Sequence, residues 1–102
     1  MKFLNKNIKS IAIYGLGYLG ECLHRDLKNT NINVEFVIDK NHLDKKIDDV
    51  KIIYLEEIKD QYPVDVIVVT TIKVYDEIKN ELRERTNIKI VSLQEVIDYF
   101  DE

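Results

Sequence analysis

Apolar and polar positions alternate along the chain in two distinct patterns. Short, nearly continuous apolar runs predict strands that are covered on both faces. Longer segments with an apolar residue every three or four positions predict amphipathic helices. The predicted strands are 9–14, 34–38, 51–54, 64–70 and 88–91, and the predicted helices are 18–29, 55–60, 72–85 and 92–100.

Three of these helices carry clear signals. Apolar residues repeat every four positions in two of them, which predicts one buried face on each. They are Leu19, Leu23 and Leu27 in the first, and Val74, Ile78 and Leu82 in the second. The third begins with a capping box, Ser92 to Glu95, in which each residue's side chain bonds to the backbone amide of the other. Val91 and Val96 flank this box as a hydrophobic staple.

The regular alternation of strands and helices predicts an α/β fold with a doubly wound parallel sheet. The expected strand order is 3-2-1-4-5. At 102 residues the chain has the size of one domain. We assign residues 10–102 to this domain and residues 1–9 to an N-terminal extension.

A glycine motif follows the first predicted strand and opens the first helix. Gly15 allows a sharp turn, Gly17 allows a phosphate to approach the backbone, and Gly20 allows the helix to pack closely on the strand. Asp39 follows the second strand, where a carboxylate can accept hydrogen bonds from a ribose. The motif predicts that Gly15, Gly17, Tyr18 and Gly20 hold the phosphates of a nucleotide and that Asp39 holds its ribose.

The expected ligand crevice lies where the strand order reverses, at the carboxyl ends of the first and fourth strands. Thr70 and Thr71 end the fourth strand, and their hydroxyls could face a ribose or phosphate. The alternative is that one of them caps the following helix.

Composition narrows the function classes. Hydrophobic residues make up 45% and charged residues 33% of the chain, as in soluble globular proteins. The formal net charge of −4 gives no support for nucleic-acid binding. No apolar run is long enough to cross a membrane, and no signal-peptide core is visible, so a cytoplasmic location is the default expectation.

Few other residues carry a signal for chemistry. The single cysteine, Cys22, is expected to pack as a small apolar residue. We expect His24 on a solvated helix face and His42 in a loop, where it contacts either a ligand or nothing. No cluster has metal-ligand spacing.

Tyr75 and Lys79 match the Tyr-Lys pair of short-chain dehydrogenases. However, the pair follows the fourth strand instead of the fifth, and no serine precedes it at the required place. We therefore expect Tyr75 to pack and Lys79 to be solvated.

Residues 13–20, 36–40, 55–58, 65–70 and 90–93 together resemble small Rossmann modules of bacterial sugar-nucleotide and polysaccharide enzymes. One such group is the cofactor domain of nucleotide-sugar dehydratases, and another is the N-terminal domain of sugar acyltransferases. The resemblance implies a minimal Rossmann-like fold that binds NAD(P) or a nucleotide sugar. The catalytic second domain of the dehydratases and the left-handed β-helix of the acyltransferases have no counterpart in this sequence.

The leading hypothesis is therefore a nucleotide-binding module of sugar-nucleotide metabolism that is not a complete enzyme by itself and has no catalytic residues of its own. One alternative is a scaffold without a ligand, which acts by association, for instance as a homodimer. A second is a small oxidoreductase that a partner chain with a catalytic domain completes.

Overall fold

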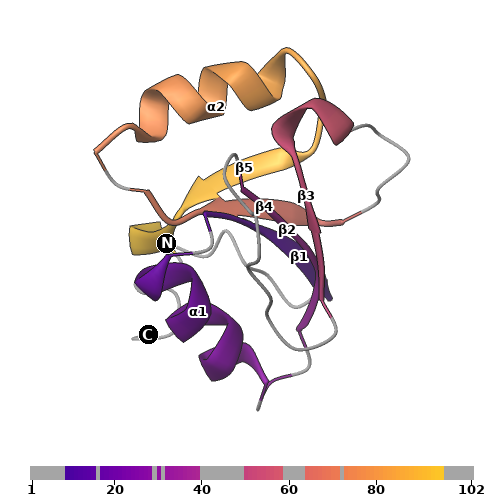
Figure 1. The fold of residues 1–102 in the computed structure, drawn as a ribbon, viewed down its shortest axis with the longest axis vertical. Helices are drawn as coiled ribbons and strands as arrows, with labels where there is room; N and C mark the ends of the chain where they lie inside the picture. The colour runs from indigo at the N-terminus through magenta and orange to yellow at the C-terminus, as the bar shows by residue number, and fades with distance from the viewer. Residues whose placement is uncertain are drawn as a thin grey trace.

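Five parallel strands form one sheet with helices on both faces (Figure 1). The computed structural model describes residues 9–15, 17–28, 30, 32–39, 50–58, 64–71 and 73–95. The strands are β1 (Ser10–Tyr14), β2 (Asn33–Ile38), β3 (Lys51–Ile53), β4 (Val66–Val69) and β5 (Lys89–Ser92). The α-helices are α1 (Tyr18–Leu27) and α2 (Tyr75–Arg83), and a 3₁₀ turn, η1, spans Leu55–Glu57.

The strand order is β3-β2-β1-β4-β5, which confirms the predicted fold class and topology. β1 lies at the centre and pairs in parallel with β2 and with β4. All five strands therefore end at one edge of the sheet. The direction of winding reverses between β1 and β4, and open α/β sheets bind ligands at such a switch point.

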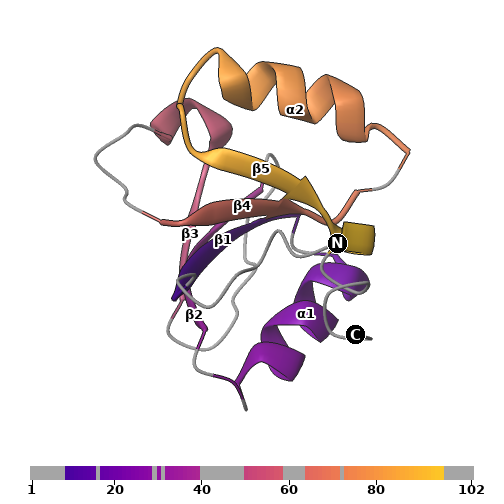
Figure 2. The same ribbon diagram turned by 180° about the vertical axis from the view of Figure 1, so that it is seen from behind.

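Alternate residues of β1 point into two separate cores. Ile11 and Ile13 pack on the side of Leu23 and Leu27 from α1. Ala12 and Tyr14 pack on the opposite side, in the core that contains residues of α2 and η1. Figure 2, seen from behind, shows the same two layers, with α1 on one face and α2 on the other. The end of β1 is thus held from both faces.

The burial of the strands follows this layering. All four residues of β4 are buried, as predicted for a central strand. In β2, by contrast, only the last three residues are buried, so the expectation of cover on both faces is wrong for its first half. Asn33 and Glu35 are exposed there, while Val34 between them packs against the α1 core.

Two residues that we expected on buried helix faces are exposed. Leu19 is 43% exposed because it lies in the first turn of α1, beside the crevice described below. Val74 is 37% exposed because α2 begins only at Tyr75, and residues 73–74 form a turn that leads into it. The other four apolar positions of the two helices are buried, as predicted.

The capping box is confirmed. The Glu95 amide donates to Ser92 Oγ at 3.3 Å, and the Ser92 amide donates to Glu95 Oε1 at 3.2 Å. Residues 93–95 are helical, so a helix does begin after β5. The rest of that predicted helix, with Val96 of the staple, lies outside the described residues, as do residues 1–8 and the loop with His42.

Candidate functional site

The loop that joins β1 to α1 turns sharply at Gly15. Its φ is +101°, in the left-handed region that favours glycine. A Cβ at this position would lie 2.6 Å from Thr70 Oγ1, which is a clash. The Gly15 amide donates to the Ile38 carbonyl oxygen at 2.8 Å, so the turn is also tied to the end of β2. Both backbone conformation and space therefore require glycine here.

Gly20 brings α1 close to this turn. A Cβ built on Gly20 would overlap the Gly15 carbonyl oxygen and would lie 3.5 Å from the Ile13 side chain. The glycine is buried in the first turn of α1. This is the close helix–strand packing that the motif predicted for the third glycine.

Gly17 differs from the other two glycines because no described residue requires a glycine there. A Cβ at this position would meet no atom of the described residues within 4 Å. Its φ of −86° and ψ of −164° are extended backbone that any residue adopts. Gly17 precedes the first turn of α1, and no side chain caps that helix. Tyr18 and Leu19 of this first turn line a hollow, and the N-terminus of a helix favours an anion.

Two adjoining hollows flank this loop and share Gly15, Gly17 and Thr71. The first has a volume of about 350 Å³ and the second about 450 Å³. The further residues that line the first are Tyr18, Leu19, Thr70 and Lys73. Those that line the second are Tyr14, Asp39, Val74, Glu77, Ile78 and Glu81. Each hollow is within the size range of small-molecule sites, and together they form the crevice at the ends of β1 and β4.

Asp39 lies where the sequence placed it, directly after β2 and on the wall of the second hollow. Its amide donates to the Ile53 carbonyl oxygen at 3.0 Å, which fixes the backbone at the end of β2 against β3. Glu77 and Glu81, one turn apart on α2, line the same hollow. Lys73 lines the first hollow. Among the described residues that line the crevice, the charges of its two halves thus have opposite signs.

The two threonines have different roles. Thr70 is buried, and its hydroxyl donates to the Tyr14 carbonyl oxygen at 2.9 Å. Thr71 is exposed and lines both hollows. The residue before α2 is Val74, with no side-chain cap, so the alternative that a threonine caps this helix is wrong. The loop at residues 73–74 separates both threonines from the helix start. Thr71 has access to the crevice, whereas Thr70 is engaged with the backbone.

Tyr14 adds a buried polar atom at the wall of the second hollow. The side chain is 5% exposed, and its hydroxyl has no hydrogen-bond partner in the described part of the chain. Burial, and then the negative charge of nearby carboxylates, raises the pKa of Tyr14 to about 12. These carboxylates belong to Glu81, Asp39 and Glu56. The hydroxyl therefore stays protonated at neutral pH and keeps a hydrogen to donate.

The sequence motif thus located most of the crevice but missed part of its wall. Of the predicted site residues, Gly15, Gly17, Asp39, Thr70 and Thr71 line the crevice, and so does Tyr18, with 76% of its surface exposed. Gly20 does not line it and is buried where α1 packs on the turn. Lys73, Glu77, Glu81 and Tyr14 were not predicted. Glu77 and Glu81 are four residues apart, so the sequence places them on one helix face, but it does not show that this face borders the crevice.

Other candidates lie outside the crevice or differ from expectation. His24 is only 8% exposed, so its placement on a solvated face is wrong. It lies one residue after Leu23 on α1, whose buried face extends that far. Cys22 is a half-buried free thiol. No group of three potential metal ligands occurs among the described residues.

Tyr75 and Lys79 do lie together, with Lys79 Nζ 5.7 Å from the centroid of the Tyr75 ring. Burial raises the pKa of Tyr75, the opposite of the lowering that proton transfer from a tyrosine needs. Tyr75 packs at the border of the α2 core, as expected. Lys79 is half-buried, not fully solvated as expected, and its ammonium lies over that ring.

Comparisons with known proteins place the chain in a family. The family model described as C2185-like, N-terminal matches residues 7–91, which is most of the chain and includes the whole crevice. No curated protein gives a significant match to the sequence. In the described part of the chain, no helix is long and apolar enough to cross a membrane.

Proposed function

The chain belongs to the C2185-like, N-terminal family, and we propose that it binds a nucleotide in the crevice at the ends of β1 and β4. The ligand class is NAD(P) or a nucleotide sugar. Its phosphates lie over Gly17 and the first turn of α1, and its ribose lies against Asp39. The biological setting is sugar-nucleotide or polysaccharide metabolism, in keeping with the resemblance of the glycine loop and the segments around it to such modules.

Gly17 carries this proposal. The fold requires the other two glycines of the motif but leaves Gly17 facing open space in a conformation that any residue adopts. A ligand that approaches the backbone explains why a side chain is absent there. The uncapped amides of α1 lie at the same point, and they stabilise a phosphate through hydrogen bonds and the helix dipole.

The second half of the crevice fits a nucleoside better than a phosphate. Asp39, Glu77 and Glu81 are acceptors when ionised and repel anions. A ribose offers hydroxyl donors to Asp39, as in other dinucleotide-binding folds. A 2′-phosphate would face three carboxylates, so NAD is favoured over NADP.

The test is titration calorimetry of the full chain with NAD, NADP and UDP-sugars. Wild-type protein is expected to bind one of these ligands, and Gly17→Ala is expected to weaken binding at least tenfold, a loss of about 1.4 kcal/mol. Because Ala fits this backbone, the melting temperature should change little. Asp39→Ala should weaken binding too, while Asp26→Ala, which removes an exposed carboxylate of α1, should not.

Two outcomes would contradict the proposal. One is the absence of binding of every ligand at millimolar concentration, which would favour a scaffold that acts by association. The other is equal binding by wild type and Gly17→Ala, which would place the ligand away from the loop. The alternative of a small oxidoreductase that a partner chain completes is tested separately, by measuring hydride transfer with candidate partner chains.

A further inference from the structure

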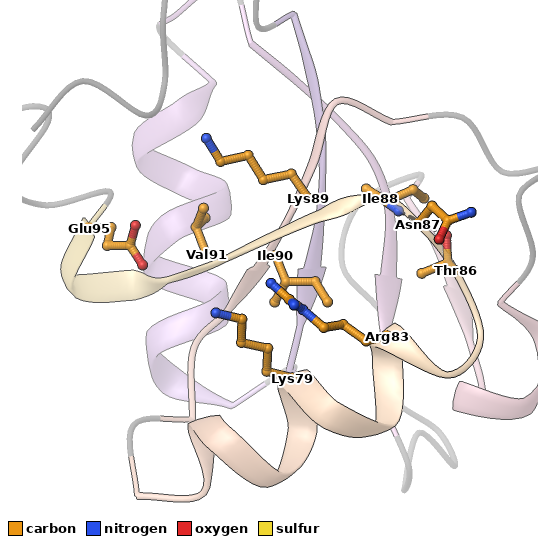
Figure 3. Close-up of a pocket in the computed structure, with 9 residues that line it drawn as sticks. All are labelled: Lys79, Arg83, Thr86, Asn87, Ile88, Lys89, Ile90, Val91 and Glu95. Carbon is orange, nitrogen blue, oxygen red and sulfur yellow. Dashed lines mark hydrogen bonds between the residues drawn. The ribbon is translucent and has the colours of Figure 1, made fainter.

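A larger hollow, of about 550 Å³, lies at the other side of α2, along the outer edge of β5 (Figure 3). It shares no residue with the crevice. The residues that line it are Lys79, Arg83, Thr86, Asn87, Ile88, Lys89, Ile90, Val91 and Glu95. We call it the β5 groove.

The floor of the β5 groove is an edge strand. β5 pairs with β4 on one side, and no other strand pairs with it among residues 9–95 that the structure describes. An edge strand presents backbone N–H and C=O groups that can pair with a further strand. The Ile88 amide already donates to Thr86 Oγ1 and the Ser92 amide to Glu95 Oε1, so the amide open to such pairing is that of Ile90 between them. Ile88 is half-buried, and Ile90 and Val91 are buried, so the floor offers little exposed apolar surface. Backbone pairing is therefore the main interaction available there.

The walls of the groove are positively charged. Lys79 and Arg83 lie one turn apart on α2, and their side chains extend toward β5 beside Ile90 (Figure 3). Lys89 extends from β5 on the opposite side of the strand, the side of α1. Of the residues lining the groove that the structure describes, Glu95 alone is acidic. A chain with a net charge of −4 thus carries cations on both sides of its open strand.

We propose that the β5 groove binds an extended acidic segment of a partner protein, which adds to the sheet as a sixth strand beside β5. Its backbone pairs with β5, and its carboxylates, which alternate between the two faces of the added strand, meet Lys79 and Arg83 on one side and Lys89 on the other. Strand addition of this kind takes affinity from the main chain and specificity from alternate side chains.

Charge argues against a second copy of this chain as the occupant. Pairing of two β5 edges would bring the cations of one groove next to those of the other, and like charges across an interface oppose association. Lysines at sheet edges discourage self-pairing for the same reason. An acidic segment would be attracted instead, because its charge is opposite to that of Lys79, Arg83 and Lys89.

The experiment starts from a displayed library of random dodecapeptides selected on the full chain. Enriched peptides are expected to carry Asp or Glu at alternate positions. The best peptide is then synthesised and titrated against wild-type protein, and hydrogen exchange is measured with and without it. The Ser92 amide already donates to Glu95 and alternate amides of β5 face β4, so new protection is expected at the Ile90 amide, and affinity should fall as salt rises.

Two variants with the same change of charge separate the groove from the rest of the surface. Arg83→Glu reverses a cation in the groove and is expected to weaken the peptide about tenfold, or 1.4 kcal/mol. Lys51→Glu makes the same reversal on β3, the strand at the opposite edge of the sheet, and should change affinity less than twofold. The melting temperatures of both variants verify that each is folded.

The proposal fails if no peptide is enriched, if enriched peptides lack acidic residues, or if Arg83→Glu and Lys51→Glu bind the best peptide equally. Sedimentation of the chain alone gives a further readout. A dimer whose formation protects the β5 amides would make a second copy the occupant and would also overturn the proposal. None of these outcomes depends on whether the crevice binds a nucleotide.

Discussion

Thr70 hydrogen-bonds the carbonyl oxygen of Tyr14 twice, through its hydroxyl at 2.9 Å and its amide at 3.1 Å. The hydroxyl also lies 3.3 Å from the Gly15 carbonyl oxygen. These contacts join the end of β4 to the end of β1 directly below the glycine turn. The position of the loop is therefore set by the neighbouring strand as well as by its own glycines.

Replacement of Thr70 by Val should cost about 1–2 kcal/mol of the free energy of unfolding, because a buried hydroxyl bond is lost at nearly constant volume. Thr71→Val is the matched control. Its side chain is exposed, so stability should change by less than about 0.5 kcal/mol. Urea unfolding of both variants measures the difference, and equal losses would show that the Thr70 bond contributes nothing.

Gly20→Ala should destabilise the protein by about 2 kcal/mol or more, because the new Cβ overlaps the Gly15 carbonyl and α1 must move away from β1. Gly17→Ala should change stability by less than about 1 kcal/mol, since only the weaker preference of Ala at a helix start applies. Thermal unfolding tests the pair. A variant at Gly20 that is as stable as wild type would contradict the close packing described above.

Tyr14→Phe should raise the free energy of unfolding by about 1 kcal/mol, because the buried hydroxyl has no partner in the described structure and its desolvation is not compensated. Chemical denaturation at pH 7 measures this. A loss of more than about 1 kcal/mol would show that the hydroxyl is hydrogen-bonded in solution.

The raised pKa of Tyr14 also predicts a loss of stability at alkaline pH. The pKa of Tyr14 is raised from 10.0 to about 12 in the folded state, so between these values the unfolded chain loses the proton first. Stability is therefore unaffected by this group below pH 10 and falls as pH rises toward 12, by up to about 3 kcal/mol in total. The free energy of unfolding of Tyr14→Phe should not show this loss between pH 10 and 12. Profiles of stability against pH that are identical for the variant and the wild type would contradict the prediction.

The lowered pKa of Asp65 predicts a smaller loss of stability at acidic pH. Its carboxylate accepts hydrogen bonds from the amides of Lys9 at 2.7 Å and Ser10 at 3.1 Å, and these bonds lower its pKa from 3.8. The stability that this carboxylate adds is present above pH 3.8 and is lost as pH falls below it. Because Asp65 is exposed, Asp65→Asn should cost less than about 1 kcal/mol at pH 7. A variant whose stability falls as steeply below pH 4 as that of wild type would exclude this role.

The strand order and the glycine loop were predictable because both depend on local patterns. Apolar runs fix which segments are buried strands, and the connections then allow few arrangements. Gly15 and Gly20 are recognisable because the sharp turn and the close helix each need a missing side chain. The capping box of Ser92 and Glu95 was predictable for the same reason, since all its bonds lie within four residues.

The parts that could not be predicted depend on contacts between distant segments. Leu19 follows the helical repeat but is exposed because the first turn of α1 borders the crevice. Thr70 and Thr71 look equivalent in sequence, and only the position of Tyr14 separates them. Glu77 and Glu81 join the crevice wall because of the way α2 crosses the sheet.

The two ends of the crevice differ in the charge of the residues that line them. Lys73 stands on one side of Gly17, and Asp39, Glu77 and Glu81 stand on the other. An elongated ligand with phosphates at its centre and an uncharged nucleoside at one end can place that nucleoside among the carboxylates and its anionic part toward Lys73. The reversed placement moves negative charge toward three negative side chains. For the nucleotide proposed above, this distribution of charge favours the orientation in which the nucleoside lies beside Asp39 and the anionic part lies beside Lys73.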